Sequence, residues 1–185
     1  VMYDALLWAI ENNPINADAL LTRYNLKPKN YLLLTVHRAD NTDNLNKLSA
    51  ILEAVKQINQ PIIWPIHPRT KKQIQEYQLK PADNIQMIEP IGYFEMLILQ
   101  SQASYVLTDS GGMQKEAYWL KTPCITLRDE TEWVETVQVG WNILTGANSQ
   151  AILDAVHHWE PETIHPPTYG DGTAAQKINQ ILSNA

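Results

Sequence analysis

The sequence predicts an α/β fold with one doubly wound, parallel sheet of six strands. Short apolar runs rich in Val, Ile, Leu and Thr recur along the chain, and each is apolar throughout rather than alternating with polar residues. Continuous apolarity is what a strand buried on both faces requires. Longer stretches of helical periodicity separate the runs, and this alternation is typical of a parallel sheet covered by helices. The 185 residues fit one domain, residues 1–185.

The strands follow from the apolar runs, which are three to six residues long. Runs of this length suit buried strands and are short for helices. The strands are expected, in order, at residues 31–36, 62–66, 85–88, 105–107, 124–127 and 142–144.

Helices are expected between the strands because capping residues precede apolar stripes there. Asn41, Asp43 and Asn44 offer caps before one such stripe, and Pro68 suits a first helical turn. The expected helices, in order, cover residues 1–8, 45–55, 69–77, 93–100, 112–120, 149–159 and 172–182. The last one follows a proline-rich loop and need not pack on the sheet; a domain outside this chain is its other possible partner.

Charge and composition exclude several classes of protein. The formal net charge is −6, which argues against a nucleic-acid-binding protein because such proteins carry a basic face. No apolar run approaches the roughly 20 residues of a membrane span, and the first residues lack the basic start of a signal peptide. The single cysteine, Cys124, cannot form an internal disulfide. It is expected to be a buried apolar residue, and the protein is expected in the reducing cytoplasm.

Polar residues follow the first and fourth expected strands. In an open parallel sheet, ligands bind beyond the carboxyl ends of the strands, where the strand order reverses. In the common doubly wound order, the first and fourth strands flank this point. The segments that follow them are 37–41 (HRADN) and 108–112 (TDSGG). His37 and Ser110 are therefore expected to face one crevice.

The turn at 108–112 runs from a strand directly into a helix and suits a phosphate. Two glycines allow a ligand to approach the backbone, and the N–H groups of a helix start favour an anion. Glu116 lies one turn further along, where its carboxylate could accept hydrogen bonds from two sugar hydroxyls. The alternative is a tight turn with Ser110 as a helix cap and a solvated Glu116, and the residues alone leave both open.

His37 is a candidate acid or base because imidazole titrates near neutral pH. The alternative is a histidine that caps the next helix or forms a hydrogen bond at the strand end. Arg38 could neutralise a phosphate or pair with Asp40. His67, which is followed by a proline, is expected to be structural.

Two other kinds of site are not supported by the spacing of residues. His157, His158 and His165 lack zinc-ligand spacing, so no metal site is expected. Ser110 does not stand in the G-x-S-x-G elbow of a serine nucleophile. The segment also lacks the lysine of a P-loop and the dinucleotide pattern G-x-G-x-x-G.

Several segments together carry a resemblance to a known family. They are 35–41 (TVHRADN), 67–68 (HP), 108–116 (TDSGGMQKE) and 128–132 (RDETE), with 169–172 (YGDG) before the last helix. In this order they resemble the non-hydrolysing UDP-N-acetylglucosamine 2-epimerase family, over nearly the whole chain. The resemblance implies an isomerase of polysaccharide biosynthesis that acts on a UDP-sugar without a metal or nicotinamide cofactor.

The resemblance also implies a larger architecture. The family has two Rossmann-like domains of the glycosyltransferase-B type, with the active site between them. This chain matches only the carboxyl-terminal, UDP-binding domain. The amino-terminal domain, which supplies several catalytic carboxylates, is therefore expected to be missing, and the chain alone is expected to be inactive. The full-length protein is expected to be a homodimer.

The resemblance implies that His37, by its position within the motifs, is the catalytic histidine at the reacting sugar. The UDP-binding positions implied by the resemblance are Ile91, Met96, Ser110, Gly111, Gly112 and Glu116. Ile91 and Met96 stand where the family holds uracil with Gln and Phe. Trp133 replaces an arginine of the family pattern T-E-R-P-E, which removes a cation near the nucleotide. The T-E-W-V-E form resembles epimerases that act on diacetamido-uronic acid sugars.

The implied reaction is epimerisation of UDP-N-acetylglucosamine at C2 to a ManNAc-type product. The C2 proton is abstracted, UDP leaves by anti elimination, and UDP then adds back to the 2-acetamidoglucal intermediate. One alternative is half of a UDP-dependent glycosyltransferase, which needs an acceptor. Others are the hydrolysing epimerase branch, which the motifs fit less well, and a non-catalytic nucleotide-binding module.

Overall fold

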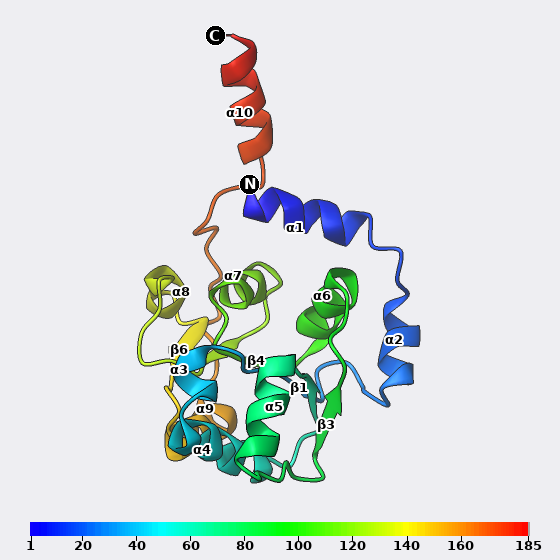
Figure 1. The fold of residues 1–185 in the computed structure, drawn as a ribbon. Helices are drawn as coiled ribbons and strands as arrows, with labels where there is room; N and C mark the ends of the chain where they lie inside the picture. The colour runs from blue at the N-terminus through cyan, green and yellow to red at the C-terminus, as the bar shows by residue number, and fades with distance from the viewer. Residues whose placement is uncertain (185) are drawn as a thin grey trace.

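The computed structural model describes residues 1–184 and contains a six-stranded sheet with helices on both faces (Figure 1). The strand order is β3-β2-β1-β4-β5-β6, and every neighbouring pair is parallel. The order reverses between β1 and β4, so these two strands flank the switch point. The predicted fold class is confirmed.

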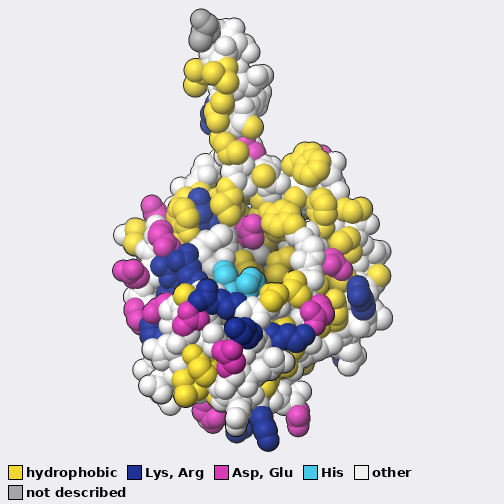
Figure 2. Space-filling model, viewed as in Figure 1, with side chains coloured by type: hydrophobic (Ala, Val, Ile, Leu, Met, Phe, Trp, Pro, Cys, Tyr) yellow, Lys and Arg dark blue, Asp and Glu magenta, His cyan; other side chains and the backbone are white. Residues whose placement is uncertain are grey.

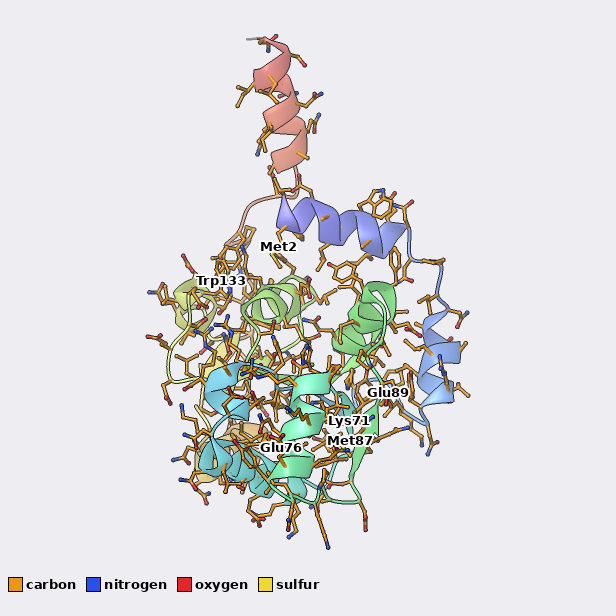
Figure 3. The ribbon with its side chains drawn as sticks, in the orientation of Figure 1. Met2, Lys71, Glu76, Met87, Glu89 and Trp133 are labelled. Carbon is orange, nitrogen blue, oxygen red and sulfur yellow. The ribbon has the colours of Figure 1, made fainter. Side chains whose placement is uncertain are left out.

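The strands agree closely with the apolar runs of the sequence. Their bounds are β1 Leu32–Thr35, β2 Ile62–Pro65, β3 Ile85–Ile88, β4 Tyr105–Thr108, β5 Cys124–Thr126 and β6 Asn142–Leu144. The prediction that every strand is buried on both faces is wrong for β3, where Gln86 and Met87 are exposed. β3 lies at the edge of the sheet, and Lys71 of the neighbouring α5 pairs with Glu89 just beyond it (Figure 3).

The helices include three that the sequence did not predict. The bounds are α1 Met2–Glu11, α2 Ala17–Arg23, α3 Ala39–Thr42, α4 Leu45–Lys56, α5 Pro68–Glu76, α6 Tyr93–Gln102, α7 Gly111–Trp119, α8 Val134–Gln138, α9 Ser149–His158 and α10 Ala174–Ser183. The prediction missed α2, α3 and α8, which have seven, four and five residues. At this length, apolar periodicity carries little signal. The last helix starts at Ala174 rather than at residue 172.

Two apolar layers cover the two faces of the sheet. Along β1, Leu32 and Leu34 belong to the layer that contains α4 and α9, whereas Leu33 belongs to the opposite layer, which contains α2, α6 and α7. Successive side chains of a strand point to opposite faces. An unbroken apolar run is therefore needed for both layers to form.

The first and last helices lie away from the sheet (Figure 1). α1 contacts α6 and α7 through a small apolar cluster with Leu6, Ala9 and Leu97. α10 has no buried residue within the described part of the chain, and Ile181 and Leu182 are strongly exposed. Figure 2 shows the apolar stripe along this helix. None of the helices within residues 1–184 is both long and apolar enough to cross a bilayer.

Candidate functional site

A cavity of about 230 Å³ opens at the carboxyl ends of β1 and β2. It is visible as the hollow around the two histidines in Figure 2. Its lining residues are Thr35, Val36, His37, Pro65, His67, Pro90, Ile91, Met96 and Met113. Three predicted site residues, His37, Ile91 and Met96, therefore line one cavity beside the switch point of the sheet.

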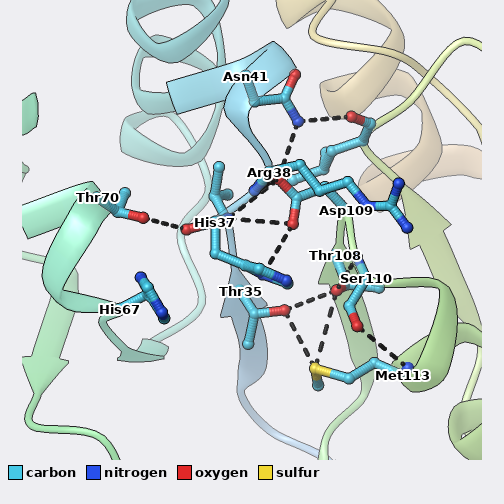
Figure 4. A network of polar contacts seen from close by, with 12 residues as sticks. Thr35, His37, Arg38, Asn41, His67, Thr70, Thr108, Asp109, Ser110 and Met113 are labelled. Carbon is cyan, nitrogen blue, oxygen red and sulfur yellow. Dashed lines mark hydrogen bonds and ion pairs between the residues drawn. The ribbon is translucent and has the colours of Figure 1, made fainter. Parts of the chain in front are cut away.

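Asp109, at the end of β4, holds the loop that carries His37 (Figure 4). Its carboxylate is fully buried and accepts hydrogen bonds from the backbone N–H groups of His37 (3.1 Å) and Arg38 (3.0 Å) and from Asn41 Nδ2 (3.2 Å). His37 Nδ1 lies 3.2 Å from Asp109 Oδ1. Burial alone would raise the pKa of Asp109, but these hydrogen bonds outweigh it and lower that pKa below its ordinary value.

Asp109 is not among the site residues predicted from the sequence. The available signal was an acidic residue directly after a buried strand at the switch point. A carboxylate on Nδ1 fixes the orientation and tautomer of an imidazole. His37 is therefore held by Asp109 at one nitrogen while its ring lines the cavity.

His67 lies across the cavity floor from His37, with 5.9 Å between ring centres. Its Nδ1 accepts a hydrogen bond from the backbone N–H of Arg69 at 3.2 Å, which caps α5. Pro68 begins that helix, as predicted. His67 thus has the expected structural role, and it also lines the cavity.

Ser110 caps α7 next to the cavity. Its Oγ accepts from the N–H of Met113 at 3.5 Å, and Thr35 and Thr108, on adjacent strands, form a 2.6 Å hydrogen bond beneath it (Figure 4). The backbone N–H of Ser110 donates to Thr108 Oγ1 at 3.0 Å. Both interpretations of the turn agree with this geometry, because a capped helix start still presents N–H groups to an anion.

Glu116 faces Tyr93 of α6. Its Oε1 accepts a hydrogen bond from the Tyr93 hydroxyl at 3.1 Å. Burial raises the pKa of Glu116 above its ordinary value, and it also raises the pKa of Tyr93 to about 12, to which the charge of Glu116 adds. Glu116 is therefore a partly buried acceptor, and Tyr93 stays a donor across the physiological range.

A cationic flank lies beside the histidines (Figure 2). A second cavity of about 460 Å³ is lined by Arg38, Asp40, Asn41, Lys47, Arg128, Asp129 and Glu130. Asp40 pairs with Lys47 at 2.7 Å rather than with Arg38, and pairing with Asp40 was one of the two roles that the sequence left open for Arg38. A chain of net charge −6 thus still presents cations at this edge of the site.

Other candidate residues do not join the site. Cys124 is buried in β5, and burial raises the pKa of its thiol to about 12, so it is an apolar packing residue as predicted. His165 stacks on Tyr118, away from the cavity. Within the described residues, no three His, Cys, Asp or Glu side chains come together as metal ligands.

The chain is similar to known proteins over its whole length. The family model of UDP-N-acetylglucosamine 2-epimerase matches residues 1–183. A UDP-N-acetylglucosamine 2-epimerase homolog of Methanococcus maripaludis is 46% identical, over 100% of this chain and 53% of that protein. The UDP-2,3-diacetamido-2,3-dideoxy-D-glucuronate 2-epimerase of Pseudomonas aeruginosa is 42% identical, over 83% of this chain and 44% of that protein. The chain therefore spans about half the length of the curated relatives it matches.

Solved structures show the same half-length match. The Methanocaldococcus jannaschii UDP-GlcNAc 2-epimerase in complex with UDP-GlcNAc and UDP has a TM-score of 0.87 and 40% identity, over 100% of this chain and 53% of that one. The Neisseria meningitidis UDP-GlcNAc 2-epimerase bound to UDP-GlcNAc has a TM-score of 0.81 and 29% identity, over 99% of this chain and 53% of that one.

A calicheamicin glycosyltransferase shares the fold more distantly, with a TM-score of 0.54 and 13% identity over 74% of this chain and 35% of that one. This distant likeness agrees with one half of a glycosyltransferase-B type architecture. The motifs, the strand order and the match over residues 1–183 agree, and the chain belongs to the UDP-N-acetylglucosamine 2-epimerase family.

Proposed function

We propose that this chain is the UDP-binding half of a UDP-N-acetylglucosamine 2-epimerase. The observation that carries the proposal is the cavity at the switch point, which is lined by His37, Ile91 and Met96 and lies against the capped start of α7. The 40% identical Methanocaldococcus jannaschii enzyme is in complex with UDP-GlcNAc and UDP. That similarity supports a nucleotide sugar as the ligand of this cavity.

Different groups in and beside the cavity suit the separate parts of UDP. Ile91 and Met96 supply an apolar surface for the uracil. The N–H groups at the start of α7, with Gly111 and Gly112 in its first turn, suit the diphosphate. Glu116 is a carboxylate acceptor for the ribose hydroxyls, and Tyr93 orients it.

The same parts serve the chemistry of C2 epimerisation. A base removes the proton at C2, the bond between C1 and the UDP oxygen breaks, and UDP leaves as an anion. The start of α7 stabilises the charge that develops on the leaving diphosphate. His37, held by Asp109, assists the proton transfers at the reacting sugar. UDP then adds back to C1 of the 2-acetamidoglucal, and C2 is reprotonated on the face opposite to the one that lost its proton.

The sugar of the proposed ligand is inferred from the names of the relatives. A UDP-N-acetylglucosamine epimerase homolog is 46% identical, and a diacetamido-glucuronate epimerase is 42% identical. The two substrates share UDP and a 2-acetamido group beside the C2 proton, so one mechanism serves both. We take UDP-N-acetylglucosamine as the substrate class to test first.

The remaining half of the site comes from an amino-terminal domain. The chain matches about half of its relatives' length, and exposed apolar side chains lie on α10 and on α1, among them Ile181 and Trp8. We propose that the amino-terminal half covers these faces, closes the cavity and supplies the base. The chain alone is then inactive. Ile181→Ser should weaken its association with that half, as measured by calorimetry, and equal affinity would contradict this.

Calorimetric titration of UDP into the chain tests the proposal. Ser110→Ala and Glu116→Ala should each weaken UDP binding, because the first removes the cap of α7 and the second the ribose acceptor. Glu76→Ala is the control, since Glu76 lies on the exposed side of α5 (Figure 3) and pairs with Lys72 of the same helix. UDP binding that is unchanged in both site variants would contradict the proposal.

A further inference from the structure

The indole of Trp133 packs directly against the first residue of α7. A Cβ atom built on Gly111 would lie 3.2 Å from Trp133 Nε1. That nitrogen is buried and has no hydrogen-bond partner within the described residues. Leaving a buried N–H without an acceptor costs free energy, so such a group calls for a structural explanation.

Lys115, one turn along α7, holds the indole in place. Its ammonium lies 4.1 Å from the ring centre of Trp133, 4.7 Å from that of Tyr169 and 5.1 Å from that of Trp119. A cation over an aromatic face is attracted by the ring. Tyr169 also meets Trp133 edge-on, with 6.1 Å between ring centres. The position of Nε1 beside Gly111 is therefore braced from two sides.

Two charged groups approach the same point beside Gly111. Measured from the built Cβ position, Arg38 Nη2 lies at 3.8 Å and Glu132 Oε2 at 3.5 Å. Glu132 is held by a two-fold hydrogen bond to Arg128, at 2.8 and 2.9 Å. That pairing lowers the pKa of Glu132 to about 2, so it is an anion at neutral pH. A carboxylate thus lies among donors at the start of α7.

We propose that Trp133 Nε1–H and the Arg38 guanidinium bind the diphosphate of the nucleotide, at the point that the Glu132 carboxylate now occupies. Both groups are donors, they converge on the first turn of α7, and their neighbour there is already an anion. Binding of the diphosphate displaces Glu132, which can swing outward because its side chain is 52% exposed, whereas the Arg128 side chain is 13% exposed and stays in place. This inference rests on the proposed UDP site and adds two specific donors and a competing residue to it.

Trp133→Phe tests the donor, because it keeps an aromatic face for Lys115 and removes Nε1–H. Titration with UDP should show binding about tenfold weaker than in the parent, as expected for one hydrogen bond to a charged group. Titration with uridine, which has no phosphate, should show unchanged affinity. The matched control is Trp119→Phe, since Trp119 Nε1 is likewise buried without a partner but belongs to the ring stacked on Tyr3. This control should leave both affinities unchanged.

Glu132→Gln tests the displacement of Glu132, and its expected effect on UDP affinity is opposite to that of Trp133→Phe. It preserves the shape of the side chain and removes the competing charge, so UDP should bind several-fold more tightly and uridine equally well. Weaker or unchanged UDP binding in Glu132→Gln would overturn the displacement. Trp133→Phe that leaves UDP binding unchanged, or weakens UDP and uridine alike, would overturn the role of the indole. A parent that binds neither UDP nor uridine would instead overturn the proposed function itself.

Discussion

His37 Nδ1 lies 3.2 Å from Asp109 Oδ1, although the two residues are 72 positions apart in the sequence. The contact joins the ends of β1 and β4, the two strands that flank the switch point. The same carboxylate accepts from the N–H groups of His37 and Arg38. Asp109 therefore connects the stability of the fold with the orientation of the candidate catalytic histidine.

Asp109→Asn should destabilise the chain by about 2 kcal/mol at pH 7, because it removes a buried charged acceptor. The pKa of Asp109 is lowered in the folded protein. Its carboxylate thus stabilises the fold above the unfolded-state pKa of about 3.9, and this contribution is lost as the pH falls through the folded-state value. Urea unfolding between pH 7 and pH 3 measures both effects.

The difference in stability between the parent and Asp109→Asn should shrink as the medium becomes acidic. Asp154→Asn is the control, because Asp154 is exposed and accepts a hydrogen bond from Gln150 of its own helix. A stability difference that stays constant down to pH 3 would contradict the charged role of Asp109.

In a protein that contains both halves, His37→Asn should slow exchange of the C2 hydrogen with heavy water by roughly 100-fold or more, as expected for loss of a general acid or base. UDP affinity should change little, because the diphosphate and ribose contacts are elsewhere. Mass spectrometry of recovered UDP-sugar measures the exchange. A parent that shows no exchange but transfers the sugar to an acceptor would favour the glycosyltransferase alternative.

Most of the fold could be predicted because burial on both faces leaves an unbroken apolar run. This holds for β1, where Leu32 and Leu33 serve opposite layers. It fails in part for β3, since an edge strand tolerates the exposed Gln86. α8 escaped prediction because its five residues hold too few periods to reveal an apolar face.

The candidate site could be predicted where its residues directly follow strands. His37 is such a residue. Ile91 and Met96, which line the same cavity, could be named only through the family resemblance. The role of Asp109 could not be predicted, because its hydrogen-bond donors come from a loop that only the strand order brings near. The contact between Trp133 and Gly111 likewise arises from packing between α7 and the segment before α8.

Gly111→Ala should lower the thermal stability of the chain, even though alanine favours a helix more than glycine does. Its Cβ would lie 3.2 Å from Trp133 Nε1, closer than an ordinary van der Waals contact, so the indole would have to shift. Placing the same substitution in a Trp133→Phe background removes the crowding atom. Thermal unfolding of both pairs should therefore show a smaller penalty in the Trp133→Phe background, and equal penalties would contradict the crowding.

On acidification, UDP affinity should begin to fall at a higher pH than it would if Glu116 had the ordinary pKa of a glutamate. Burial raises the pKa of Glu116, while the hydrogen bond from Tyr93 opposes part of that increase. Only the ionised carboxylate accepts from two ribose hydroxyls at once, so binding weakens as the pH falls through the raised pKa. Tyr93→Phe removes the opposing donor and should move the loss of affinity to still higher pH.

UDP titrations from pH 7 to pH 4.5 measure the shift. Glu116→Gln, which cannot ionise, should lose the Glu116-dependent part of the pH response. A pH response in Glu116→Gln equal to that of the parent would assign it to another group.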